Sequence, residues 1–313
     1  MAPTPPTMDQ TYGIWVIALT IQSTLFGMGL LQAYLYFFWY PKDNWVAKSA
    51  VILITVLETI QTAFFTATTY KSLVTEFGNF PNLDIIDWTA TTQLQVLYTS
   101  TFVAQIYFAW GIYLFRRKEW LYPLLVAIVA IAALGAGIAQ TVLVSRLTNY
   151  SQLGQTSAAT NTQAALAFAC DIMITVGLWW RLSGSKGGIQ STNRLLNFLI
   201  MTAINRGVLT MLTALLNIIL FLAVPGTFEF MAALLISGKL YMNSMLAMLN
   251  TRAHATSIAK GATVMDGESF SMNAQRSQLH HTGMAMPRVT VIEETHINMD
   301  HDMGYGKKKP QVV

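Results

Sequence analysis

The stretch LYPLLVAIVAIAALGAGIAQTVLVS, residues 121–145, contains no charged side chain and decides the class of fold. A helix of about 20 apolar residues crosses the roughly 30 Å hydrocarbon core of a bilayer. This stretch has 25 residues, which is more than the crossing needs. We therefore predict that residues 121–145 form a helix that spans a membrane.

Six further apolar runs of similar length lie on either side of this one. They occupy residues 12–39, 46–70, 89–115, 161–181, 195–223 and 228–250. A spanning sheet with open edges would leave backbone polar groups unpaired in hydrocarbon, and the alternating pattern of a membrane barrel is missing, so only helices fit. We predict an all-α membrane protein with a seven-transmembrane-helix bundle at residues 12–252. A short extracellular segment, 1–11, precedes the bundle, and a disordered cytoplasmic tail, 253–313, follows it.

The composition agrees with a lipid bilayer as the main partner of the chain. Of its 313 residues, 53% are hydrophobic and 11% are charged, whereas about 25% of the residues in soluble domains are charged. The net charge of +4 comes from loops and tail, which indicates membrane topology and argues against nucleic-acid binding. The single cysteine, Cys170, excludes an intramolecular disulfide and a cysteine-based metal knuckle.

The orientation follows from the basic residues of the short loops, which collect on the cytoplasmic side. The larger group contains Lys42, Lys48, Arg116, Arg117, Lys118, Arg181, Lys186, Arg194 and Arg252, and the smaller contains only Lys71 and Arg146. The N-terminus is therefore predicted outside and the C-terminus inside. The sequon Asn149-Tyr150-Ser151 then lies outside, which makes Asn149 a glycosylation candidate and favours the plasma membrane or an endomembrane.

Several segments of the chain resemble one known family. They are LQAYLYF at 31–37, YPKD at 40–43, YKSLVTEFGN at 70–79, TAINRGVLT at 202–210, GKLYMNS at 238–244 and LNTR at 249–252. These segments are similar to a seven-helix integral membrane family that is abundant in mushroom-forming fungi and whose domain is of unknown function. The resemblance covers about residues 12–252 and implies a seven-helix bundle, but it implies no ligand and no reaction.

Four ionisable residues fall inside the predicted spans: Glu58, Asp171, Arg206 and Lys239. A charged side chain at the bilayer centre costs roughly 2.5–3.5 kcal/mol on insertion scales, so we expect all four to point into the bundle. Two acids and two bases predict an interior ion-pair network, in which Glu58 or Asp171 partners Lys239 and Arg206. Polar residues on the same helix faces extend this candidate intramembrane charge layer: Gln61, Thr175, Thr210, Asn217 and Asn243.

The charge layer has two interpretations that are compatible with each other. In the first, it holds the helices together through hydrogen bonds and salt bridges. In the second, it lines a ligand pocket or carries a conformational signal, because ionisable residues inside a membrane are functional candidates by default. The sequence alone leaves both interpretations open.

Known classes of seven-helix protein and transporter fit the motifs poorly. Lys239 resembles the retinal lysine of rhodopsins in position, but residues 89–115 contain no acidic counterion. The signature motifs of receptors coupled to G proteins are absent, so the likeness to receptors is one of topology. Transporters often have repeated halves with Gly or Pro breaks; here Gly135 and Gly137 are predicted to form a close-packing face instead.

Catalytic and cofactor chemistry finds little support in the sequence. No HExxH, GxSxG or CxxC motif appears, and we expect neither an enzyme nor a cofactor or metal site. Our leading hypothesis is a receptor-like sensor of a small or lipidic ligand that reaches the outer half of the bundle, with a cytoplasmic partner for the tail. The alternative is a transporter or channel that uses the charge layer.

Overall fold

The fold was analysed in a computed structural model, which describes residues 12–115, 118–184, 197, 201, 204, 207–213, 215–216, 219–220 and 232–251. These residues all belong to one compact unit, Met1–Thr263, and the second unit, Val264–Val313, contains none of them. Over the described ranges the chain is helical, and its β-structure is limited to an isolated bridge between Ile85 and Asn149. The predicted segments 1–11 and 253–313 lie outside the described residues.

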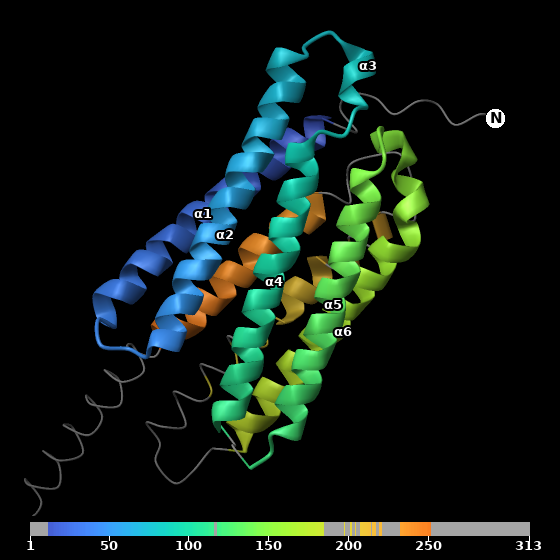
Figure 1. Cartoon of the computed structure of the whole chain (residues 1–313). Coiled ribbons are helices and arrows are strands. Elements are labelled where there is room, and N and C mark those ends of the chain that lie inside the picture. Colours follow the sequence, from blue (N-terminus) through green and yellow to red (C-terminus); the bar gives the residue numbers. More distant parts are fainter. Residues whose placement is uncertain are drawn as a thin grey trace, which may run out of the picture. The chain divides into compact units, whose positions relative to one another are not determined.

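Six long helices make up most of the described chain (Figure 1). They are α1 (Ile14–Trp39), α2 (Trp45–Tyr70), α4 (Trp88–Phe115), α5 (Leu121–Ser145), α6 (Ser157–Ser183) and a last helix, Ala232–Thr251, drawn in orange. Three short helical segments lie between them, namely η2 (Lys71–Thr75), α3 (Phe80–Leu83) and η3 (Tyr150–Thr156). The five labelled long helices begin and end within four residues of the predicted apolar runs.

Among the described residues, five helices are long and apolar enough to cross a membrane: α1, α2, α5, α6 and the last helix. The 28 residues of α4 are also long enough, but no long stretch of this helix is as apolar as those of the five. Polar residues lower the hydropathy of α4. Burial keeps them away from lipid, since Thr89, Gln93, Ser100, Thr101 and Gln105 are each at most 8% exposed. In the predicted span 195–223, the residues that are described are helical as well.

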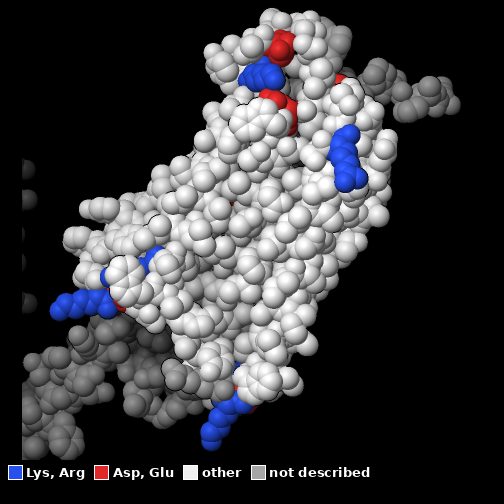
Figure 2. All heavy atoms as spheres, viewed as in Figure 1, with Lys and Arg blue, Asp and Glu red and all other residues white. Residues whose placement is uncertain are grey.

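The outer surface of the long helices is apolar, as a helix in contact with lipid requires. Ile17 of α1, Leu125 of α5 and Val176 of α6 are exposed by 61%, 51% and 49%, and many other large apolar side chains are similarly exposed. On the face shown in Figure 2, charged side chains gather near the two ends of the bundle and leave a broad uncharged band between them. The arrangement matches that of a membrane-associated helical protein.

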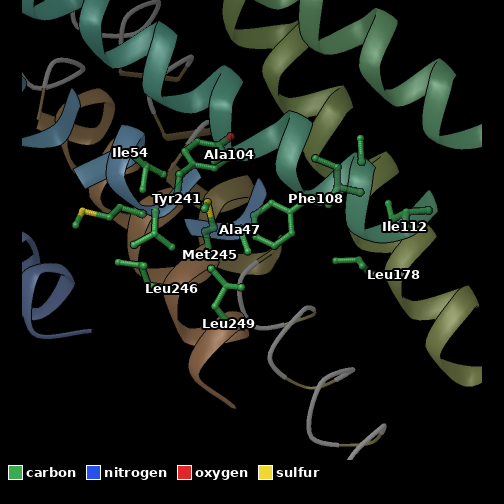
Figure 3. Packing of buried hydrophobic residues seen from close by; sticks show 14 of the residues in the cluster. Ala47, Ile54, Ala104, Phe108, Ile112, Leu178, Tyr241, Met245, Leu246 and Leu249 are labelled. Carbon is green, nitrogen blue, oxygen red and sulfur yellow. The ribbon is translucent and has the colours of Figure 1, made fainter. Parts of the chain in front are cut away.

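The core contains small and large side chains that fit together where α2, α4, α5, α6 and the last helix meet (Figure 3). The labelled members of this cluster are Ala47, Ile54, Ala104, Phe108, Ile112, Leu178, Tyr241, Met245, Leu246 and Leu249. Part of the predicted glycine face is correct, because a Cβ atom at Gly137 would lie 2.7 Å from the ring of Tyr98. The prediction for Gly135 is wrong, since no atom of the described residues lies within 4 Å of its Cβ position.

The chain reverses between successive helices, so that its connections collect at two ends. We call one the Asp84 end, which contains residues 71–87 and 146–156, and the other the Asp43 end, which contains residues 40–44 and 118–120. At the Asp84 end, the backbone amide of Tyr150 donates to the carbonyl oxygen of Asp84 at 2.7 Å. At the Asp43 end, the buried Arg181 donates to the carbonyl oxygen of Glu119 at 3.0 Å. The first contact joins two loops at the Asp84 end, and the second joins α6 to the loop 118–120 at the Asp43 end.

Candidate functional site

The centre of the bundle holds an ion pair between Lys239 of the last helix and Glu58 of α2. The two atoms of the pair, Lys239 Nζ and Glu58 Oε2, are 2.5 Å apart, and both side chains are 0% exposed. The ammonium group also donates to Gln61 Oε1 at 2.6 Å and to the carbonyl oxygen of Glu58 at 3.2 Å. Each of its three hydrogens therefore has an acceptor, as a charge buried away from water requires.

The surroundings of the pair fix the position of the carboxylate. The hydroxyl of Ser100 on α4 donates to Glu58 Oε1, so the second carboxylate oxygen also has a partner. The ring of Phe26 on α1 lies 5.3 Å from Lys239 Nζ, within the range of a cation–π contact. Gly238 permits the close approach of the last helix to α2, because a Cβ atom there would lie 3.1 Å from Glu58 Oε1.

Gln22 of α1 lies at the level of this ion pair, as two helix registers indicate. Asn243 donates to the carbonyl oxygen of Leu25, and Asn250 donates to that of Gln32, so α1 and the last helix run parallel with a constant offset of 218 residues. That offset places Gln22 beside Leu240. Counted from the contact between the rings of Trp15 and Phe65, at 5.7 Å, Gln22 lies at about the same height along the bundle as Glu58.

The Gln22 side chain is 0% exposed, and neither its Oε1 nor its Nε2 has a hydrogen-bond partner among the residues that the structure describes. Gln61 Nε2 also has none within those ranges. Buried amides are nearly always matched by protein or by ordered water. Gln61 therefore provides an unused donor at the ion pair itself, and Gln22 provides an unused amide in the interior of the bundle.

A second polar contact joins the last helix to α6. The hydroxyl of Tyr241 donates to Asp171 Oδ2, and Asp171 is 1% exposed. Lys239 and Tyr241 are two residues apart on one helix, so their side chains leave it in directions about 200° apart. The last helix is consequently held on opposite flanks, by Glu58 on one side and Asp171 on the other.

The remaining predicted site residues are spread over the bundle. Thr175 donates to the carbonyl oxygen of Asp171 in its own helix, and Thr210 donates to that of Gly207. Asn243 lies one turn from Lys239 and joins the last helix to α1 through the carbonyl oxygen of Leu25, at 2.8 Å. Arg206 and Asn217 lie outside the described residues.

The sequon at the Asp84 end takes part in a contact between loops. Asn149 Nδ2 donates to Asp84 Oδ2 at 2.9 Å, and both the backbone amide and the hydroxyl of Ser151 donate to the same carboxylate, at 2.9 and 2.8 Å. An asparagine amide carries two hydrogens, so this contact uses only one of them. Asn149 thus has a structural role in addition to its predicted role as a glycan acceptor.

Two small pockets share lining residues: the first lies toward the Asp84 end, and the second extends as far as Tyr241, at about the level of the ion pair. The first, of about 40 Å³, is bounded by α4, α5, η3 and the last helix, and the second, of about 30 Å³, by α4, α6, residues 207–213 and the last helix. Leu97 and Leu234 line both. Gln93 lines the first pocket, is 2% exposed, and its Oε1 has no hydrogen-bond partner in the part of the chain that is described.

A larger pocket of about 360 Å³ lies at the Asp43 end, between α2, α4 and the last helix. Its walls include Tyr107, Phe108 and Trp110 of α4 and Met248 and Leu249 of the last helix. Asp43 and Asn44 supply its polar groups, and neither Lys239 nor Glu58 lines it. The ion pair is therefore separate from the pockets at both ends.

Sequence reasoning missed three residues that touch or adjoin the charged groups: Gln22, Ser100 and Tyr241. Each is a neutral polar residue within an apolar run. The available signal was the presence of such residues on helices already assigned to the membrane, where a polar side chain favours the bundle interior. Only the ionisable residues and the polar residues close to them in sequence had been singled out by that signal.

Comparison with known families finds a match to one part of the chain. Residues 167–254 match the family model described as a family of unknown function, DUF6534. That range includes most of α6 and the whole of the last helix, with Asp171, Lys239 and Tyr241. No curated protein and no solved structure matches the chain.

Proposed function

We propose that this chain is a multi-pass membrane protein with seven spans that acts as a receptor-like sensor of a small or lipidic ligand. In this proposal the Asp84 end faces the outside of the plasma membrane or an endomembrane, and the Asp43 end faces the cytoplasm. The basic residues of the short loops support this orientation. The resemblance of residues 12–252 to a seven-helix membrane family supports the number of spans.

The observation that carries the proposal is the path of the last helix. Its first turn contributes Leu234 to both pockets near the Asp84 end, its middle contributes Lys239 to the ion pair, and its last turns contribute Met248 and Leu249 to the large pocket. One helix therefore contacts the two small pockets, the Lys239–Glu58 ion pair and the large pocket at the Asp43 end. A ligand that displaces the first half of the last helix therefore changes the shape of the large pocket at the other end of that helix.

A direct contact path joins the small pockets to the ion pair. Leu97 lines both pockets, and its Cδ1 atom is the first that a Cβ atom at Gly238 would meet. Gly238 in turn lies against Glu58 Oε1. A ligand that moves Leu97 thus acts on the segment of the last helix that contains Lys239.

The sensor proposal is tested by measuring the position of the last helix when the Lys239–Glu58 ion pair is weakened. Spin labels at Lys42→Cys and Thr251→Cys, in a Cys170→Ala background in lipid nanodiscs, report the distance between the α1–α2 loop and the end of the last helix. Glu58→Gln keeps the size of the side chain and removes its charge, and we expect it to shift or broaden this distance distribution. Glu76→Gln, in the loop of the Asp84 end, is the matched control and should leave the distribution unchanged. Equal distributions for wild type and Glu58→Gln would contradict the proposal.

The alternative function, a transporter or channel that uses the same charges, is favoured by one observation. Gln61 accepts from Lys239 through Oε1, while its Nε2 has no hydrogen-bond partner among the described residues, as at a site for a transient ion or water. Flux through proteoliposomes decides between the two functions. Proton or cation flux that is present in wild type and lost in the double variant Lys239→Met/Glu58→Leu, which removes both charges and is expected to stay folded, would replace the sensor with a carrier or channel.

The orientation is tested separately with single cysteines in the Cys170→Ala background. Val74→Cys lies in η2 at the Asp84 end, and Lys118→Cys lies at the Asp43 end; both positions are exposed. We expect an impermeant maleimide to label Val74→Cys, and not Lys118→Cys, on intact cells. The reverse result would invert the proposed topology.

A further inference from the structure

The first pocket near the Asp84 end has the composition of a binding site for a small, mainly apolar molecule. Its walls are formed largely by aliphatic side chains, among them Ala90, Leu94 and Leu235. Gln93 and Gln140 are its amide side chains. Ligand sites in proteins combine an apolar lining with a few polar groups that orient the ligand, and this pocket has that pattern.

The two glutamines differ in whether their side-chain oxygen already accepts a hydrogen bond. Gln140 Oε1 already accepts a hydrogen bond from the hydroxyl of Tyr98, at 2.6 Å. Gln93 Oε1 accepts none from the residues that the structure describes, and it has almost no accessible surface, so its amide must rotate for the oxygen to meet a ligand in the pocket. Burying an acceptor without a donor is unfavourable, so a ligand that supplies a hydrogen-bond donor recovers part of that cost.

The size of the space limits the ligand. The pocket beside Gln93 and its neighbour have volumes of about 40 and 30 Å³. A single water needs roughly 10–15 Å³ by this measure, so each pocket has room for about two or three waters. A molecule that reaches from one pocket into the other past Leu97 and Leu234 has roughly four to six non-hydrogen atoms.

We infer that the pocket beside Gln93 binds a short aliphatic alcohol, whose hydroxyl donates a hydrogen bond to Gln93 Oε1 and whose chain lies along Leu97 and Leu234. This inference deepens the proposed sensor function by naming the class of ligand and its position. The ligand does not touch the ion pair directly; it acts through Leu97, which packs against Gly238.

The test compares two isomeric probes that differ in one respect. The molecules 1-butanol and diethyl ether have the same formula, but only the alcohol donates a hydrogen bond. Binding is measured by saturation-transfer NMR with protein in nanodiscs of deuterated lipid, so that the readout does not depend on a conformational change. We expect 1-butanol to bind with a Kd of roughly 0.1–10 mM, as befits a ligand with so few atoms.

Two variants locate the site. Gln93→Leu removes the acceptor and keeps a similar volume, and we expect it to weaken 1-butanol binding about 2- to 12-fold while diethyl ether is unaffected. Ala90→Leu fills the pocket and should abolish binding of both probes. Equal effects of Gln93→Leu on the two probes, or 1-butanol binding that survives Ala90→Leu, would overturn the inference.

The site and the sensor function fail in different ways. If 1-butanol binds as predicted but leaves the distance between labels at Lys42→Cys and Thr251→Cys unchanged, the binding site is supported and the sensor function is contradicted for this ligand. If the distance responds to Glu58→Gln but 1-butanol does not bind, the sensor function is supported and the site is wrong.

Discussion

Removal of the Lys239 ammonium group is expected to destabilise the bundle strongly. In Lys239→Met, the carboxylate of Glu58 keeps its bond from Ser100 but loses the cation 2.5 Å away, while it stays 0% exposed. Breaking a buried pair by removing one partner costs about 3–5 kcal/mol, because a charge is left without compensation. We therefore expect the free energy of unfolding to fall by about 3–5 kcal/mol.

The double variant Lys239→Met/Glu58→Leu separates the pair from the packing around it. Replacing both charges with apolar side chains of similar volume is often neutral or stabilising, because the desolvation cost disappears together with the attraction. We expect the double variant to unfold within about 1 kcal/mol of wild type, although each single variant costs several. The difference is the coupling energy of the two side chains.

The assay is equilibrium unfolding in mixed micelles with increasing SDS, followed by circular dichroism at helical wavelengths. Lys71→Met is the matched control, because Lys71 pairs with Asp87 at 3.0 Å but is 51% exposed. An exposed pair contributes at most about 1 kcal/mol. A cost of Lys239→Met no larger than that of Lys71→Met, or a double variant that costs the sum of the singles, would refute the reasoning.

Three further predictions concern packing and hydrogen bonds. Gly238→Ala should lower the free energy of unfolding by about 1–3 kcal/mol through overpacking, whereas Gly135→Ala, with open space around its Cβ position, should raise it by about 0.5–1 kcal/mol in the same SDS titration. Tyr241→Phe removes a donor to the buried Asp171 and should cost about 1–3 kcal/mol, also measured by unfolding. Asp84→Ala removes the acceptor shared by Asn149 and Ser151 and should speed amide exchange in residues 146–156 by about tenfold or more, measured by mass spectrometry.

The helix boundaries were accessible from the sequence because hydropathy is a local property. The apolar run at 121–145 coincides with α5, and the run at 161–181 falls four residues short of the start of α6. The missing residues, 157–160, are Ser-Ala-Ala-Thr, which a hydropathy reading does not separate from the preceding loop. Helix α4 was predicted correctly by length although its buried polar side chains reduce its mean hydropathy.

The partners of the ionisable residues were not accessible from the sequence, because they depend on which helices are neighbours and on their register. The sequence left both Glu58 and Asp171 as partners for Lys239, whereas the structure pairs Lys239 with Glu58 and brings Tyr241 to Asp171. Neutral polar residues such as Gln22 were missed for a related reason. One amide in an apolar run carries little signal until its surroundings show that it is buried without a partner.

The two polar contacts of the last helix also determine how it can move. Glu58 and Asp171 hold it from opposite sides at positions 239 and 241, so rotation about its own axis would break both contacts at once. A tilt about this point keeps both. Thr251 lies ten residues beyond Tyr241, about 15 Å along the helix, so a tilt of about 10° moves it by roughly 2.6 Å. The movement is largest beside the 360 Å³ pocket, where there is space to accommodate it. A response of this bundle should therefore be measured at the Asp43 end of the last helix and should be nearly absent at Lys239.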